Sequence, residues 1–175
     1  MKALYIEKHG GNEVLRFGEV PEPSPCRGEV AIRMKTAAMN RLDIFVRNGI
    51  PGVPIRLPHV PGADGYGVVE ALGDGVKDLK PGDAVVLQPG LSDGTCEFCR
   101  AGETSLCVDF RILGEHLSGT FAEKIVVPRE NVFPAPKNLT PEKAAAFPLA
   151  ALTGVRDQSI RMTTFPKPFP LSRCS

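Results

Sequence analysis

The sequence predicts a mainly β fold with short helices, in one domain over residues 1–155, followed by an irregular or disordered tail over residues 156–175. Three observations indicate this. Glycine and proline, with 18 and 17 residues, make up a fifth of the 175-residue chain without any period, which is typical of many short elements joined by turns. Apolar runs are short and rich in β-branched residues, as in Ala84–Leu87. The tail lacks a sustained apolar period, and its three prolines exclude a regular helix or a central strand.

The first part of the chain predicts three strands and a helix. A Gly-rich turn separates two expected strands over residues 2–6 and 14–17. Apolar and polar residues alternate over residues 29–34, which predicts a half-buried strand. Over residues 40–48 the apolar residues recur at spacings of three and four, so we expect a short amphipathic helix that ends before Gly49.

The second part predicts further strands and one more helix. Strands are expected over residues 65–72, 84–87 and 125–127. Thr140 can cap a helix that has Pro141 at its first position. We expect this helix to run through residue 146 until Pro148 disturbs it.

Composition and charge argue against nucleic-acid and membrane partners. Lys and Arg number 21 and Asp and Glu 20, which leaves a net charge of +1, and no stretch concentrates basic residues. No apolar run approaches the roughly 20 residues that span a bilayer. The N-terminus meets charge at Glu7 and Lys8 before the apolar part of a signal peptide could form. We therefore expect a cytoplasmic protein.

The five cysteines are unevenly distributed. Cys96, Cys99 and Cys107 lie within twelve positions, whereas Cys26 and Cys174 stand apart. In a reducing compartment such a cluster indicates a metal site more readily than a disulfide framework.

Several short motifs follow one another in a characteristic order: Asn40-Arg41-Leu42-Asp43, Pro61–Val69, Gly73–Val76, Pro81–Val85, the cysteine cluster, Gly119–Glu123 and Ala144–Thr153. Together they resemble the medium-chain dehydrogenase/reductase superfamily, which includes zinc-type alcohol dehydrogenases and quinone oxidoreductases. The resemblance covers residues 1–155 and implies a GroES-like, partly open β-barrel with a small zinc-type lobe. In the family this domain lies against a Rossmann domain that holds NAD or NADP, with a small-molecule substrate in the cleft between them. A homo-oligomer is compatible with this family.

The resemblance assigns the cysteine cluster to the structural zinc lobe. Family members carry four cysteines there, and this chain keeps the last three at the same spacing, with Asp93 in the first position. Zinc accepts thiolate sulfur and carboxylate oxygen in tetrahedral sites, so Asp93, Cys96, Cys99 and Cys107 form a sensible ligand set. Two alternatives stay open: an empty lobe with reduced thiols, and a Cys96–Cys99 disulfide.

The resemblance also locates the position of the family's catalytic zinc, whose ligands are two cysteines and a histidine. The aligned residues are Asn40, Ala63 and Leu149, and a three-ligand zinc centre cannot be built from them. The chain is therefore similar to the zinc-independent, quinone oxidoreductase-like branch. There Asn40, Asp43 and Asp64 become candidates for the substrate cleft, although Asn40 could equally serve as a helix N-cap and the two aspartates as structural acceptors.

Two further residues are candidates for a role in the cleft. Thr153 matches a threonine that faces the nicotinamide in the family, which a complete protein alone could use. His116 is a candidate for proton relay because histidine titrates near neutral pH, although a surface-loop position explains it as well.

A phosphate-binding loop is missing from the sequence. Hydride transfer needs a positioned nicotinamide, and the usual device is Gly-x-Gly-x-x-Gly between a strand and a helix, which this sequence does not contain. The Rossmann domain is thus expected to be absent from this chain. Two functions follow: the catalytic domain of an NAD(P)-dependent oxidoreductase that is inactive alone, or a non-catalytic zinc-binding β-domain that acts as a remnant or an interaction module.

Overall fold

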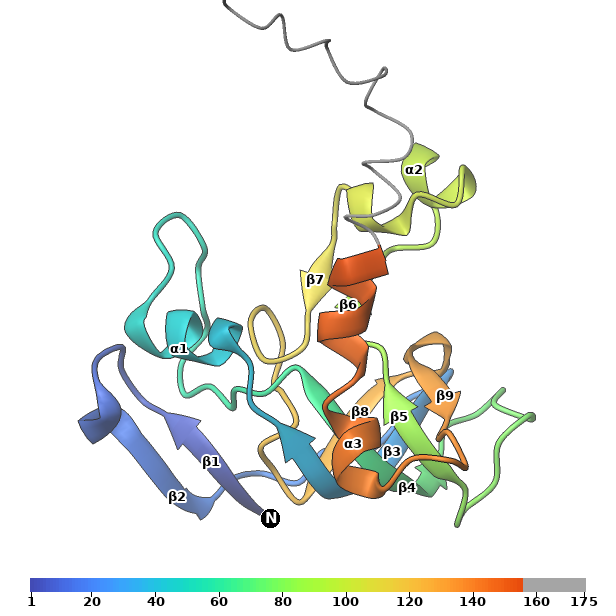
Figure 1. Cartoon of the computed structure of the whole chain (residues 1–175), viewed down its shortest axis with the longest axis horizontal. Helices are drawn as coiled ribbons and strands as arrows, with labels where there is room; N and C mark the ends of the chain where they lie inside the picture. Colours follow the sequence, from blue (N-terminus) through green and yellow to red (C-terminus); the bar gives the residue numbers. More distant parts are fainter. Residues whose placement is uncertain (156–175) are drawn as a thin grey trace, which may run out of the picture.

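The computed structural model describes residues 1–155, and the predicted tail lies outside the described residues. A five-stranded antiparallel sheet in the order β8-β3-β4-β5-β9 forms the main body (Figure 1). Its strands are β3 (Glu29–Ala38), β4 (Asp64–Leu72), β5 (Ala84–Leu87), β8 (Lys124–Pro128) and β9 (Val132–Pro134). Two small sheets accompany it: β1 (Lys2–Ile6) with β2 (Leu15–Glu19), and β6 (Gly90–Leu91) with β7 (Arg111–Ile112). The predicted mainly β fold with short helices is confirmed.

The alternation of side chains along the central strands builds the core. Strand β3 pairs with β4 on one side and with β8 on the other, and two register irregularities interrupt its pairing with β4. Such irregularities bend and twist a strand, which helps a sheet to curl around its apolar face. The core members are Val30, Ile32, Val69, Leu79, Val85, Leu87, Leu113, Ile125, Val127 and Val132. Most are β-branched, which explains why short apolar runs predicted the strands correctly.

Two glycine-rich turns form a tight seam beside the sheet. The backbone N–H of Gly119 donates to the Val60 carbonyl at 2.7 Å, and that of Thr120 donates to the Gly62 carbonyl at 2.9 Å. Gly62 has φ 105°, a conformation that favours glycine. A Cβ atom added at Gly119 would lie 2.1 Å from the Gly62 oxygen, so the two backbones approach more closely than any side chain allows. This seam fixes the turn that precedes Asp64.

The predicted helix over residues 40–48 is present as α1 (Arg41–Asn48), with Asn40 as its N-cap and Gly49, at φ 88°, as its C-cap. Thr140 also caps α3 (Pro141–Ala145), because its hydroxyl oxygen accepts the Lys143 N–H at 3.5 Å. The expectation that Pro148 only disturbs this helix was wrong. Residues 148–155 form a second helical segment that Pro148 begins, since proline lacks only an N–H that the first turn leaves unpaired in any case.

The remaining elements are single turns. They are the short helix α2 (Glu97–Arg100) and the 3₁₀ turns η1 (Asn12–Val14), η2 (Thr104–Leu106) and η3 (Arg129–Asn131). Within the described residues, none of the helices has the length and apolar character needed to cross a bilayer.

Candidate functional site

The cysteine cluster lies in a lobe that stands away from the main sheet. Strands β6 and β7 form its stem, and α2 lies at its far end (Figure 1). Several backbone hydrogen bonds shape its turns, including Arg100 N–H to the Cys96 carbonyl at 3.0 Å and Phe110 N–H to the Cys107 carbonyl at 3.1 Å. The lobe buries little apolar surface of its own, so its loops depend on these polar contacts.

The lobe brings the four predicted ligands together. One ligand atom from each of Asp93, Cys96, Cys99 and Cys107 lies within 4.8 Å of the other three. Tetrahedral zinc with Zn–S bonds of about 2.3 Å needs sulfur atoms roughly 3.8 Å apart, so a small contraction would complete such a site. Within residues 1–155 this is the one group of three or more acidic, cysteine or histidine residues that could hold a metal ion. The chemistry of the donor set fits zinc.

Asp93 both shapes the loop and offers an oxygen. Its Oδ1 accepts the N–H groups of Thr95 at 2.6 Å and Cys96 at 2.8 Å. These bonds hold the pKa of the Asp93 carboxyl far below its ordinary value. The group is therefore an ionised donor at every physiological pH, and one of its oxygens is engaged with the backbone.

The three thiols differ in their protonation. The backbone N–H of Cys99 is the main cause that lowers the pKa of Cys96, whereas burial and the neighbouring Cys96 sulfur raise the pKa of Cys99 to about 11. The Cys107 sulfur accepts the N–H groups of Asp93 at 3.3 Å and Asp109 at 3.4 Å. Three thiolates and a carboxylate this close together repel one another, so full ionisation of the set needs a bound cation. The four cysteines of the described residues are free thiols, so the alternative of a Cys96–Cys99 disulfide is not what the structure contains.

The three cleft candidates, Asn40, Asp43 and Asp64, are also brought together. Asp43 Oδ2 accepts the Asn40 backbone N–H at 2.7 Å, and Asp43 Oδ1 accepts the Gly62 N–H at 3.0 Å. Asp64 Oδ2 accepts from Asn40 Nδ2 at 2.9 Å, and Asp64 Oδ1 accepts the Leu149 N–H at 2.9 Å. A continuous chain of hydrogen bonds therefore runs from the Pro61–Gly62 turn through α1 to the helical segment 148–155.

The two aspartates in this chain are buried. Asp64 is 0% exposed and Asp43 is 7% exposed, whereas Asn40 is half-buried. Burial raises the pKa of both carboxyls, and the hydrogen bonds that they accept oppose this rise. Of the three candidates, Asn40 is thus the one with its side chain within reach of a ligand.

The positions aligned with the family's catalytic metal offer no side chain that could ligate it. Ala63 is fully buried, and Leu149 enters the network through its backbone N–H. Thr153 is exposed on the segment 148–155, and its hydroxyl donates to the Leu149 carbonyl at 2.8 Å. His116 is exposed beside the lobe stem, where its Nδ1 accepts the Ile112 N–H at 3.2 Å.

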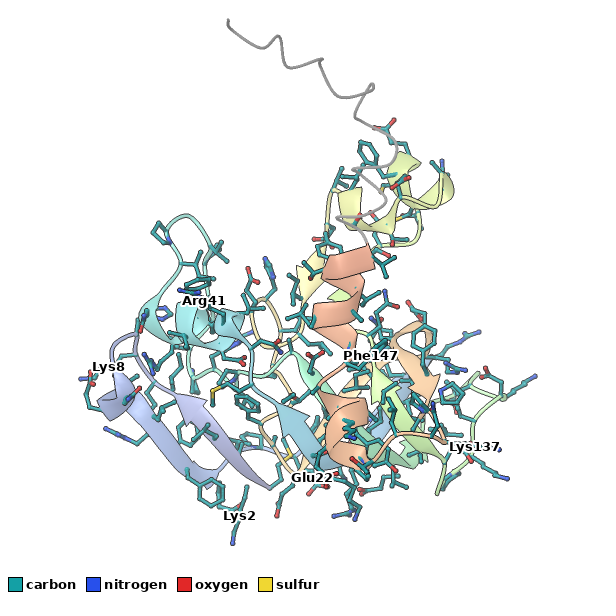
Figure 2. The ribbon with its side chains drawn as sticks, in the orientation of Figure 1. Lys2, Lys8, Glu22, Arg41, Lys137 and Phe147 are labelled. Carbon is teal, nitrogen blue, oxygen red and sulfur yellow. The ribbon has the colours of Figure 1, made fainter. Side chains whose placement is uncertain are left out.

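An apolar groove lies where the segment 148–155 crosses β5 and β9. The groove holds about 330 Å³, and its wall includes the exposed side chains of Phe133, Phe147, Leu152 and Val155. Phe147 marks the junction between α3 and this segment (Figure 2). A larger cavity of about 530 Å³ lies between the β1–β2 hairpin and β8, and none of the predicted site residues lines it. The sequence did not indicate either space, because each is formed by segments far apart in the chain.

Comparison with known proteins agrees with this architecture. Residues 26–137 match the family model of the alcohol dehydrogenase GroES-like domain. An alcohol dehydrogenase of Geobacillus stearothermophilus is 34% identical over 155 residues, which cover 87% of this chain and 45% of that protein. A crystal structure of an NAD-dependent alcohol dehydrogenase superposes with a TM-score of 0.88 at 49% identity, over 95% of this chain and 49% of that one.

A second solved structure is similar over the same region. It is a cobalt- and zinc-bound thermostable alcohol dehydrogenase from Pyrobaculum aerophilum, with a TM-score of 0.83 and 36% identity over 95% of this chain and 50% of that one. This chain therefore spans about half the length of the relatives that it matches.

Proposed function

This chain belongs to the alcohol dehydrogenase GroES-like domain family, and from that premise we propose that it is the catalytic-domain portion of an NAD(P)-dependent oxidoreductase with a structural zinc lobe. The observation that carries the proposal is the similarity to a solved NAD-dependent alcohol dehydrogenase, at 49% identity over 95% of this chain. The domain so defined is residues 1–155. The substrate class is a quinone, enone, aldehyde or alcohol.

Zinc in the lobe has a structural role in this proposal. Asp93, Cys96, Cys99 and Cys107 would hold it, and the metal would supply the positive charge that lets the thiols ionise together. The site lies on a stem outside the sheet, far in the fold from Asn40 and Asp64 (Figure 1). Three cysteines and a carboxylate also leave no open position for a substrate, so the metal's contribution is folding free energy.

The substrate side of the cleft is assigned to Asn40, with Asp43 and Asp64 behind it. Asn40 is the polar side chain of this network that is only half-buried, and the two aspartates hold it through its backbone N–H and its Nδ2. NAD or NADP supplies the hydride chemistry when it is bound by the other half of such an enzyme. Thr153 is the residue of this chain that we assign to the nicotinamide side, through a hydroxyl that now donates to the Leu149 carbonyl.

The exposed apolar groove supports a second domain at this face. Phe133, Phe147 and Leu152 are exposed by between 45% and 59%, which is unusual for a cluster of large apolar side chains that remains uncovered. The relatives are about twice as long as this chain. We assign the groove to contact with their cofactor-binding half.

The second candidate function is a non-catalytic zinc-binding β-domain. The observation that favours it is the lack of a Gly-x-Gly-x-x-Gly loop in the 175 residues, which leaves the chain by itself without the usual dinucleotide site. A protein of this kind, with reduced thiols in the lobe, suits the cytosol.

A fusion experiment distinguishes the two functions. Residues 1–155 would be joined to the cofactor-binding half of the 49%-identical relative, and NAD(P)H oxidation would be assayed with quinones, enones and aldehydes. Turnover by the fusion, with none by the chain alone or by the isolated cofactor half, supports the oxidoreductase. A fusion that folds and binds coenzyme but turns over none of the substrate classes favours the non-catalytic domain.

A further inference from the structure

Asp64 joins three separate segments of the chain. Its backbone lies at the start of β4, in register with Ala38 of β3, so it is anchored on the main sheet. Its carbonyl oxygen accepts the Thr120 hydroxyl at 2.8 Å. Its two carboxylate oxygens reach away from the sheet to Asn40 and Leu149, both at 2.9 Å.

Both groups that the carboxylate binds would otherwise lack firm support. Leu149 is the second residue of the helical segment 148–155, and first-turn N–H groups have no partner within their own helix. Asn40 is the N-cap of α1, and a carboxamide on a short loop can rotate freely unless one of its ends is held. Asp64 satisfies both donors at once, at 0% exposure, where an unpaired donor would be costly.

We propose that Asp64 is the positioning residue of the cleft, a buried carboxylate strut that fixes the Asn40 carboxamide and the first turn of segment 148–155 against the sheet. Asn40 and Leu149 are two of the positions at which the family resemblance expects metal ligands, and here one side chain of the protein links them by hydrogen bonds. The assignment of Asn40 to the substrate side rests on the proposed function, whereas the strut itself does not.

A swap of the two side chains tests the strut. Asn40→Asp places two carboxylates together, and Asp64→Asn turns an amide nitrogen toward one of two donors. We expect each single variant to lower the folding equilibrium constant about tenfold or more, because a buried group loses its partner. The double variant Asn40→Asp/Asp64→Asn restores both bonds, since the new amide oxygen accepts from Leu149 and its nitrogen donates to the new carboxylate. We expect this variant to recover most of the loss.

The swap separates a strut from a simple helix cap. Aspartate caps helices as well as asparagine does, so a capping role alone predicts that Asn40→Asp is nearly neutral. Asp83→Asn is the matched control, because the Asp83 carboxylate accepts one backbone N–H at 3.0 Å in a surface turn. Its expected change is about twofold or less. A double variant that is as unstable as the sum of its parts would overturn the proposal.

Amide hydrogen exchange on the unchanged protein keeps the test independent of whether the variants fold. The proposal requires a Leu149 N–H protected from exchange, although it belongs to the first turn. Exchange of this proton at the rate of an open amide would contradict the strut. None of these readouts involves coenzyme or turnover, so the oxidoreductase proposal and the strut can fail separately.

Discussion

Single side chains in the lobe differ in what their removal takes away. The three cysteines offer soft thiolate ligands, whereas Asp93 offers one carboxylate oxygen that water or another oxygen donor could replace. We therefore expect purified protein to hold at most one zinc ion per chain. Cys99→Ala should abolish retention during dialysis against a weak chelator, and Asp93→Ala should weaken it more mildly. Elemental analysis after dialysis measures both effects.

The control for the lobe is Cys26→Ala, because Cys26 is an exposed cysteine far from the cluster in sequence and should leave the zinc content unchanged. Protein prepared without chelator that contains no zinc, with all three lobe thiols free, would show that the lobe is empty in solution.

The buried carboxyls of Asp43 and Asp64 predict a pH effect with a definite sign. Burial raises the pKa of both above the ordinary aspartate value of about 3.9. In the window between that value and their folded pKa values, the folded protein keeps protons that the unfolded chain has lost. Their contribution to the free energy of unfolding therefore falls as pH rises through this window and is constant above it. Carboxyl ¹³C NMR titration should place both midpoints above those of exposed aspartates.

Other carboxyls act in the opposite direction, so the titration must be resolved by residue. The Arg129 guanidinium lowers the pKa of Asp78, and the Lys124 ammonium lowers that of Glu22. These exposed groups favour folding above their ordinary pKa values and lose this effect in acid. Midpoints for Asp43 and Asp64 at or below the ordinary value would contradict the burial argument.

Among the connecting segments, the seam between the Pro61–Gly62 turn and Gly119 offers a strict steric test. A Cβ at Gly119 would lie 2.1 Å from the Gly62 oxygen and 2.5 Å from that of Pro61, and both are backbone atoms that cannot rotate away. Gly119→Ala should therefore cost at least about 1–3 kcal/mol of stability, as overpacking does. Urea unfolding measures the change.

The matched control uses the same substitution where space is open. Gly154 lies in the helical segment 148–155, and a Cβ there meets no atom within 4 Å. Gly154→Ala should stabilise the protein by up to about 1 kcal/mol, because alanine is the better helix former. Equal effects of the two substitutions would mean that the seam is looser than its backbone distances imply.

Regular elements were the part of the fold that the sequence predicted well. Strands such as β5 and the helix α1 follow from local patterns of apolar residues and from their caps, which are properties of neighbouring residues. The segment 148–155 was missed because Pro148 reads equally as a helix breaker and as a first helical residue. The capping of that segment by Asp64, 85 positions earlier, has no local signal in the sequence at all.

Over the whole molecule, the two candidate sites differ in how far sequence could define them. The lobe ligands lie within fifteen residues at a fixed spacing, so one loop contains the whole set, and the structure places their donor atoms together. The cleft network draws on β4, α1 and the segment 148–155, and its geometry depends on how the sheet curls. The motif order of the family could name its residues, but the pairing of Asp64 with Leu149 required coordinates.

The last prediction concerns the whole chain: by itself it should show no measurable affinity for NAD(P)H and no dehydrogenase turnover. Dinucleotide binding depends largely on a glycine backbone and a helix N-terminus at the pyrophosphate, and the sequence contains no Gly-x-Gly-x-x-Gly loop to provide them. Orienting a hydride donor against its substrate can contribute roughly 7–11 kcal/mol to lowering a barrier, and one wall of a cleft cannot supply this. Titration of NADPH fluorescence against the zinc-loaded protein is the measurement, with the fusion to a cofactor-binding half as the positive control. Saturable micromolar binding by the chain alone would mean that its own residues, with the Phe133–Phe147 groove the first place to look, form a coenzyme site of a different kind.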